Sequence, residues 1–277
     1  MNSIKYCFFI LCISLSSSIS YADLLISPLR VVLDGKQRSS NVTLINSGNE
    51  TRSYRVSWSQ KVALPKGGYR DLTEVEQQNY AGLERIVRIS PKQVTLSPGQ
   101  RQTVKLLLRD PGNLPSGEYR SHLTFTALPI HKNDSSQPSG QTGIQLNVLM
   151  SYTMPVIYRT GNVSVAPAID NLSLLTIKET GATFIKVQLS HNDLFSSSGR
   201  LVAYWTPTGQ PTRQVGLLNG FNFYPENKNA EIRVPWNNFK LEPGSLEVRY
   251  EGQQEFNGLL LARQILEITP AMVRSVQ

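Results

Sequence analysis

The stretch GIQLNVLMSYTMPVIYR, residues 143–159, has the alternating pattern of a long β-strand. Every second position carries a large apolar or aromatic side chain: Ile144, Leu146, Val148, Met150, Tyr152 and Met154. Because side chains of a strand point to opposite faces in turn, these residues share one face. Pro155 cannot donate a hydrogen bond to a sheet ladder and therefore favours a sheet edge. An apolar face on an exposed edge invites aggregation, so we expect something to cover it.

Shorter runs of the same character, rich in Val, Leu, Thr and aromatic residues, lie on both sides of this stretch. Before it lie RVVLDG, SNVTLINSG, RSYRVSWSQKV, RQTVKLLLRDP and HLTFTALP; after it lie TFIKVQLS, GRLVAYWTPTG, AEIRVPW, SLEVRYEG and LLLARQILEI. Turn residues bound them at the spacing of an all-β sandwich. The polar segment 129–143 is interpreted as a loop within the first domain. The chain is therefore predicted to be all-β, with two sandwich domains in tandem at 23–160 and 161–277.

Residues 1–22, MNSIKYCFFILCISLSSSISYA, have the features of a removable signal peptide. A basic residue, Lys5, precedes a short apolar run, and small residues follow before Asp23, where we expect the mature chain to begin. Leu11 before Cys12 argues against a lipoprotein signal. Both cysteines, Cys7 and Cys12, lie inside this segment, so the exported protein is predicted to have no disulfide. No later segment is apolar enough to span a bilayer, and no membrane insertion is expected.

The composition and motifs indicate a binding protein rather than an enzyme. The formal charge of +8 comes from scattered Lys and Arg without basic runs, and with export this argues against nucleic acid. The histidines, His122, His131 and His191, are not at metal-ligand spacing. No nucleophile elbow, zinc-protease motif, phosphate loop or dinucleotide fingerprint is present. Glu74 and Glu76 are best interpreted as a solvated turn. We expect no catalysis, metal or cofactor.

The order of several segments resembles one known family, the periplasmic pilus-assembly chaperones of the bacterial chaperone–usher pathway. The segments are ISPLRVVLDGKQRSSNVTLIN, RISPKQVTLSPGQRQTVKLLL, LPSGEYRSHLTF and the opening stretch with its MPVIYR ending. The resemblance covers nearly all of the first domain and, more weakly, the second. The PVIYR ending is similar to the archaic (sigma) branch. The resemblance implies two immunoglobulin-like domains at an angle, a periplasmic location, and two partners: a pilin subunit and an outer-membrane usher.

The resemblance also implies a role for the opening strand. Chaperones of this family donate a strand to a pilin that lacks its last one, which is called donor-strand complementation. The donated residues would be Ile144, Leu146, Val148, Met150 and Tyr152. Same-face residues lie about 6.6–7 Å apart, so each would enter a successive pocket. The alternative is that this face packs on the core of its own domain. In the donor interpretation Leu149, on the opposite face, points to that core.

Charged residues of the first domain match other positions of the family. Arg30 matches the arginine that binds the pilin's C-terminal carboxylate, which suits the planar fork of a guanidinium. The alternative is that Arg30 is an ordinary exposed arginine of a strand. The family's usual partner lysine aligns with Pro155, so Arg30 would act alone or with an arginine such as Arg88.

Arg159 matches an arginine that pairs with acids to set the angle between the domains. By the same resemblance, the acids would be Glu118 and Glu251. The alternative is that these three residues are separate surface charges.

Two other classes of protein fit the sequence less well than a chaperone. A structural pilus subunit or adhesin should carry its own N-terminal donor extension and usually a disulfide, and neither is evident. A carbohydrate-binding module or hydrolase would need exposed tryptophans or a cleft of carboxylates. The tryptophans, Trp58, Trp205 and Trp236, all lie in strand-like segments.

Overall fold

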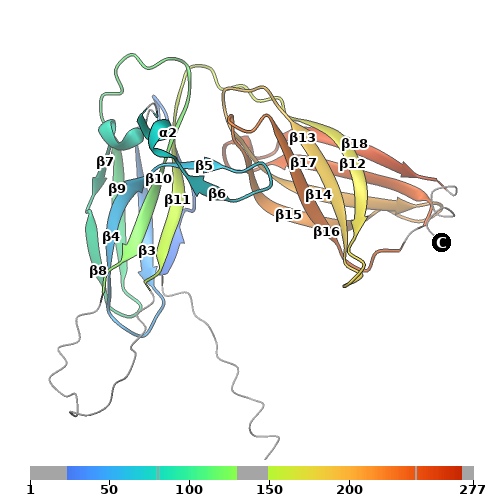
Figure 1. Ribbon diagram of the computed structural model, residues 1–277, viewed down its shortest axis with the longest axis horizontal. Helices are drawn as coiled ribbons and strands as arrows, with labels where there is room; N and C mark the ends of the chain where they lie inside the picture. Colours follow the sequence, from blue (N-terminus) through green and yellow to red (C-terminus); the bar gives the residue numbers. More distant parts are fainter. Residues whose placement is uncertain (1–23, 79, 81, 130–148, 241, 270–277) are drawn as a thin grey trace, which may run out of the picture.

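The computed structural model describes residues 24–78, 80, 82–129, 149–240 and 242–269. The expected signal peptide, and the expected donor residues Ile144, Leu146 and Val148, lie outside these ranges. The described chain is all-β and forms two β-sandwich domains set at an angle, which confirms the predicted fold class (Figure 1). None of the helices in the described ranges has the length and apolarity that a membrane crossing requires.

The first domain consists of two facing sheets and a small hairpin. One sheet has the strand order β1 (Leu24–Ser27), β3 (Ser39–Asn46), β9 (Arg101–Leu108) and β7 (Val87–Ser90). The other has the order β2 (Val31–Leu33), β11 (Ser151–Thr160), β10 (Gly117–Ala127), β4 (Arg52–Ser59) and β8 (Gln93–Leu96). The hairpin consists of β5 (Lys61–Ala63) and β6 (Tyr69–Asp71), followed by a short helix α2 (Glu74–Gln78) and a 3-10 turn η1 (Leu83–Arg85).

The second domain repeats the sandwich architecture with longer strands. Its smaller sheet has the order β12 (Ala168–Thr176), β13 (Thr183–Ser190) and β16 (Asn229–Trp236). Its larger sheet has the order β15 (Arg213–Phe223), β14 (Ser197–Pro207), β17 (Gly244–Gly252) and β18 (Leu260–Ile268), and a 3-10 turn η2 (Gln254–Phe256) joins the last two strands.

Alternation along the strands builds one apolar core in each domain. Residues on the inner faces of β3, β9, β10 and β4, including Leu44, Leu106 and Phe125, are fully buried in the first core. In the second core the ring centroids of Trp205 and Trp236 lie 5.3 Å apart, and both side chains are buried. These two tryptophans therefore do not form the exposed platform that a carbohydrate-binding module would need.

The opening strand is an edge for only part of its length. From Val156 to Tyr158, β11 lies between β10 and the parallel strand β2. From Ser151 to Pro155 it pairs with β10 alone, and no strand within the described ranges covers its other side. The edge position expected from Pro155 thus applies up to that residue and is wrong beyond it, because β2 takes over the pairing there.

The apolar face of the same strand changes its surroundings between Met150 and Tyr152. Met154 is 2% exposed, and Tyr152 is partly buried against the first core. Met154 and Tyr152 therefore pack on the core of their own domain, which was the alternative to donation. In the described chain Tyr152 is not free to enter a partner's groove. Met150 is 53% exposed and Leu149 is 45% exposed. Leu149 does not reach the core, because these two residues lie where the strand leaves the sandwich.

Candidate functional site at the domain junction

Two strands of the first domain bring opposite charges to the boundary with the second domain. Glu118, near the start of β10, lies directly across the antiparallel ladder from Arg159, near the end of β11. Facing side chains on neighbouring strands are within contact distance. The second domain contributes Ser196, just before β14, and Glu255 in η2. Arg30 precedes β2, one position before the pairing of Val31 with Val156.

Arg159 and Glu118 form a buried ion pair that is bonded to the second domain. The Nε of Arg159 donates to Oε2 of Glu118 at 3.0 Å, and its Nη2 donates to the carbonyl of Ser196 at 2.7 Å. The same carboxylate oxygen accepts from the Ser196 amide at 2.9 Å and hydroxyl at 2.8 Å. The two charged side chains are 3% and 2% exposed. A buried network of this kind determines geometry more than it adds stability, because desolvation offsets much of its attraction.

Arg30 contacts a carboxylate of the second domain. Its Nη1 lies 2.8 Å from both carboxylate oxygens of Glu255, and its Nη2 lies 3.3 Å from the Ser196 hydroxyl. Arg159 Nη1 also lies 2.8 Å from Glu255. Burial acts to raise the pKa of Glu255, but the charge and hydrogen bonds of Arg30, with Arg159, outweigh it and hold the pKa below its usual value. Glu255 is therefore a carboxylate shared by two arginines.

The acid predicted in the second domain, Glu251, is not at this junction. Its carboxylate lies 2.8 Å from Nε of Arg200, a partner within its own domain. The residue that reaches Arg159 is Glu255, four positions later. The chain leaves β17 through an irregular register at Tyr250 and Glu251, and Gln254 has a φ of 58°. A side-chain-bearing residue seldom adopts this left-handed conformation. The family resemblance, which named Glu251, did not anticipate the turn that brings Glu255 to Arg159.

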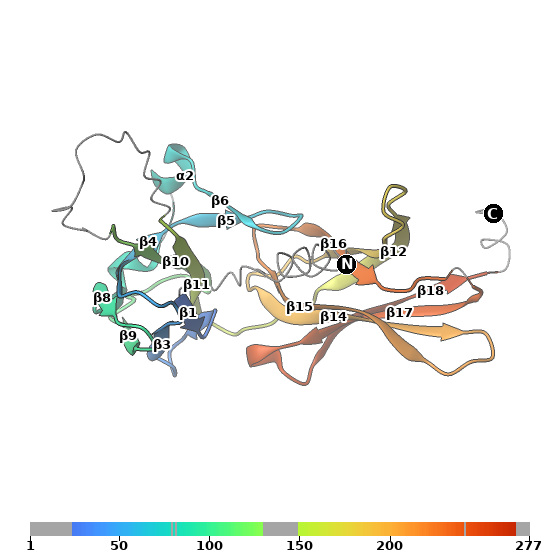
Figure 2. The same cartoon turned by 90° about the horizontal axis from the view of Figure 1, so that it is seen from below.

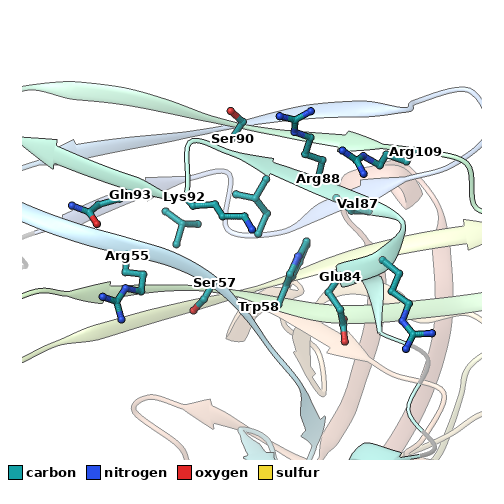
Figure 3. Close-up of a pocket in the computed structure, with 13 residues that line it drawn as sticks. Arg55, Ser57, Trp58, Glu84, Val87, Arg88, Ser90, Lys92, Gln93 and Arg109 are labelled. Atoms are coloured by element: carbon teal, nitrogen blue, oxygen red, sulfur yellow. The ribbon is translucent and has the colours of Figure 1, made fainter.

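Arg88, the predicted second cation, also lies away from Arg30. It is an exposed residue of β7, in the sheet that faces the one containing β2. Figure 3 shows it with Arg109 at a cavity of about 950 Å³ between β7 and β4, lined also by Trp58. Five cations line this cavity, and none of them forms an ion pair within the described residues: Arg55, Arg85, Arg88, Lys92 and Arg109. Arg88 therefore belongs to a basic groove of the first domain and not to the junction.

A second set of contacts joins the domains through the β5–β6 hairpin, which extends along the second domain (Figure 2). Arg120 pairs with Glu226 and lies 3.9 Å over the ring of Tyr224. The Ala63 amide donates to Glu226 at 3.0 Å, and the hydroxyls of Tyr69 and Tyr224 are 3.0 Å apart. Sequence reasoning missed this contact. The available signal was Arg120, which shares a strand face with Glu118 two positions earlier.

His122 lies behind the hairpin and makes no hydrogen bond through either ring nitrogen within the described residues. Its ring meets Tyr69 edge-on, with centroids 4.9 Å apart. Burial, together with the positive charges of Arg120 and Lys61, lowers the pKa of His122 to about 3. The imidazole is therefore neutral at ordinary pH and acts as an aromatic packing residue. No group of three potential ligands that could hold a metal is found among the described residues.

Comparison with known proteins gives similarity in structure alone. No family model matches the sequence, and no curated protein matches it. One similar solved structure is the YadV chaperone, with 13% identity over 88% of this chain and 100% of that chain and a TM-score of 0.44.

Two other similar structures are complexes. The CsuC–CsuE chaperone–tip adhesion subunit complex from archaic Csu pili of Acinetobacter baumannii matches at 14% identity over 90% and 99% of the two chains, with a TM-score of 0.43. The SafA pilin–SafB chaperone complex of Salmonella enterica matches at 14% identity over 89% and 98%, with a TM-score of 0.45. At these identities and TM-scores, the similarities do not by themselves assign this chain to a family or a function.

Proposed function

We propose that the protein is a non-enzymatic periplasmic chaperone that binds pilin subunits by donor-strand complementation and delivers them to an outer-membrane usher. The observation that carries the proposal is the position of Arg30 beside the open edge of β11. Because Val31 pairs with Val156 in parallel register, Arg30 lies level with Pro155. A cation that binds carboxylates is therefore placed where the uncovered edge ends.

This placement determines how a partner strand would be oriented. A strand added to Ser151–Pro155 would occupy the line that β2 continues, so its end would meet Arg30. Of the two ends of a chain, only the C-terminus carries a carboxylate, so the end beside Arg30 would be the partner's C-terminus. The partner strand would then run in the same direction as β11, in parallel. Main-chain hydrogen bonds along the edge would supply affinity, and the guanidinium would hold the terminal carboxylate.

The apolar residues before this edge would then enter the partner's core. Met150 is half exposed in the free chain, and we extend the role to Ile144, Leu146 and Val148 on the same face. Burying each of these side chains would contribute about 1.5–3 kcal/mol. Tyr152 is excluded from the set, since it already packs on the first core. Because the PVIYR ending resembles the archaic branch of these chaperones, we place the protein in that branch.

Replacing Arg30 by Ala tests the proposal. We expect the variant to fold and to lose the small subunit that co-purifies with the wild type from periplasm, because the terminal carboxylate would lack its charged partner. Arg200→Ala is the matched control, since Arg200 pairs with Glu251 inside the second domain. An undiminished yield of subunit with folded Arg30→Ala protein would contradict the anchor. The absence of any bound subunit from the wild type would contradict the function itself.

A further inference from the structure

In the free chain, the position that a ligand carboxylate would take on Arg30 is already occupied. Both oxygens of the Glu255 carboxylate lie 2.8 Å from Nη1 of Arg30. The Arg30 side chain is only 7% exposed, and its Nε is buried without an acceptor within the described residues. A second carboxylate therefore cannot reach the guanidinium fork while Glu255 and the surrounding chain stay in place.

The charge of the cluster leads to the same conclusion. Arg30 and Arg159 contribute two positive charges, and Glu118 and Glu255 contribute two negative ones. Three ion pairs join them in the order Arg30, Glu255, Arg159 and Glu118. A cluster that is balanced in this way offers no net charge to an incoming anion. Taking a further carboxylate into a partly desolvated site requires a cation that is not already paired.

Glu255 has a second partner that can hold it when Arg30 is taken. Its Oε1 lies 2.8 Å from Nη1 of Arg159, and Arg159 is itself fixed by Glu118 and the Ser196 carbonyl. The Glu255 side chain is 28% exposed, so water can also reach it. Releasing Arg30 thus leaves neither an unpaired buried charge on Glu255 nor a loose Arg159.

We propose that Glu255 is an internal competitor for the carboxylate site, so that a partner binds by displacing Glu255 from Arg30. The inference rests on the proposed function, because it concerns the same anchor. A small free carboxylate would only exchange the Arg30–Glu255 ion pair for an equivalent one with Arg30, so it would bind weakly. A carboxylate at the end of a strand also gains the edge of β11, so the competition selects carboxyl-terminal strands over small anions.

The experiment titrates the free protein with sodium acetate at constant ionic strength and follows the Arg30 Nε and Glu255 carboxyl resonances by NMR. Glu255→Gln keeps the size of the side chain but removes its charge and replaces one acceptor oxygen by an NH2 donor, which cannot accept from an arginine. Glu251→Gln is the matched control, because Glu251 is an arginine-paired carboxylate of similar exposure, 22%, away from Arg30. We expect Glu255→Gln to bind acetate about tenfold more tightly than the wild type, the effect of losing one charge-assisted contact. Glu251→Gln should match the wild type.

The wild type gives a second measurement that does not depend on the folding of a variant. As acetate saturates the site, the Arg30 and Glu255 resonances should move together with one dissociation constant. Equal acetate affinity in the wild type and folded Glu255→Gln, or an Arg30 signal that moves while Glu255 does not, would overturn the exchange. Both results are independent of whether a pilin co-purifies, so failure of the exchange and failure of the chaperone function are separate outcomes.

Discussion

Met150 and Met154 are a matched pair on one face of the opening strand, and replacing each by Ala separates the two roles of that face. Met154 is 2% exposed and lies in the first core, whereas Met150 is 53% exposed. Removing a buried Met side chain costs about 2–5 kcal/mol of folding free energy, because it loses apolar burial and leaves a cavity. Removing an exposed one changes stability by about 0.5 kcal/mol or less.

The two substitutions should have the reverse effect on the partner. If Met150 enters a pilin groove, truncating it removes roughly 1.5–3 kcal/mol of apolar burial from the complex. That loss corresponds to a dissociation constant about tenfold to hundredfold larger. Met154→Ala should leave the affinity of the folded protein nearly unchanged, since Met154 faces the core of the first domain.

Urea unfolding of the free variants gives the stabilities, and titration of each folded variant with the co-purified subunit gives the affinities. Equal destabilisation by Met150→Ala and Met154→Ala would show that Met150 also packs inside the first domain. Unchanged subunit affinity in Met150→Ala would refute the reasoning that this face is donated.

Three further outcomes are expected at the domain junction. Arg159→Ala should widen the distribution of angles between the domains and destabilise the protein by about 3–5 kcal/mol, because Glu118 is left as an unpaired buried charge; an unchanged small-angle scattering profile would contradict this. Glu226→Ala should loosen the hairpin contact by removing the partner of Arg120, which hydrogen exchange at residues 61–71 would detect as faster exchange, and unaltered rates would count against a second clamp. Glu255 has a folded-state pKa below its unfolded value, so the stability it contributes is present above the unfolded pKa and is lost as pH falls through the folded pKa. The acid branch of the stability curve should therefore be shallower in Glu255→Gln, and superimposable acid branches would contradict the linkage.

Local pattern was enough to predict most of the strands, and the family resemblance predicted the meeting of Glu118 with Arg159. Alternation and turn residues locate strands, and two adjacent antiparallel strands place facing residues together. The resemblance also named Arg30, which the structure places at the same junction. The strands depend on residues close in sequence, and Glu118 faces Arg159 through a simple strand ladder.

The failures have a different physical origin. The resemblance named Glu251, but the turn that contains the left-handed residue Gln254 brings Glu255 to Arg159 instead. The division of the apolar face between Met150 and Tyr152 depends on where the sandwich ends in space. Arg120, in β10, contacts Glu226, which lies 106 positions later between β15 and β16 of the second domain. The sequence offers only the position of Arg120 on the strand face of Glu118, and it carries no local signal for the partner that Arg120 meets in the other domain.

In the proposed complex, the register of β2 against β11 would give the last residue of the bound strand a fixed position. A carboxylate held at Arg30 lies level with Pro155, and every partner residue is then placed by its distance from that end. Lengthening the partner by one residue would move its strand by about 3.3 Å and turn its side chains to the opposite face. Lengthening it by two would restore the face but shift each side chain to the neighbouring pocket. The protein would thus select partners by the position of each residue relative to the C-terminal carboxylate, with little dependence on which residues they carry.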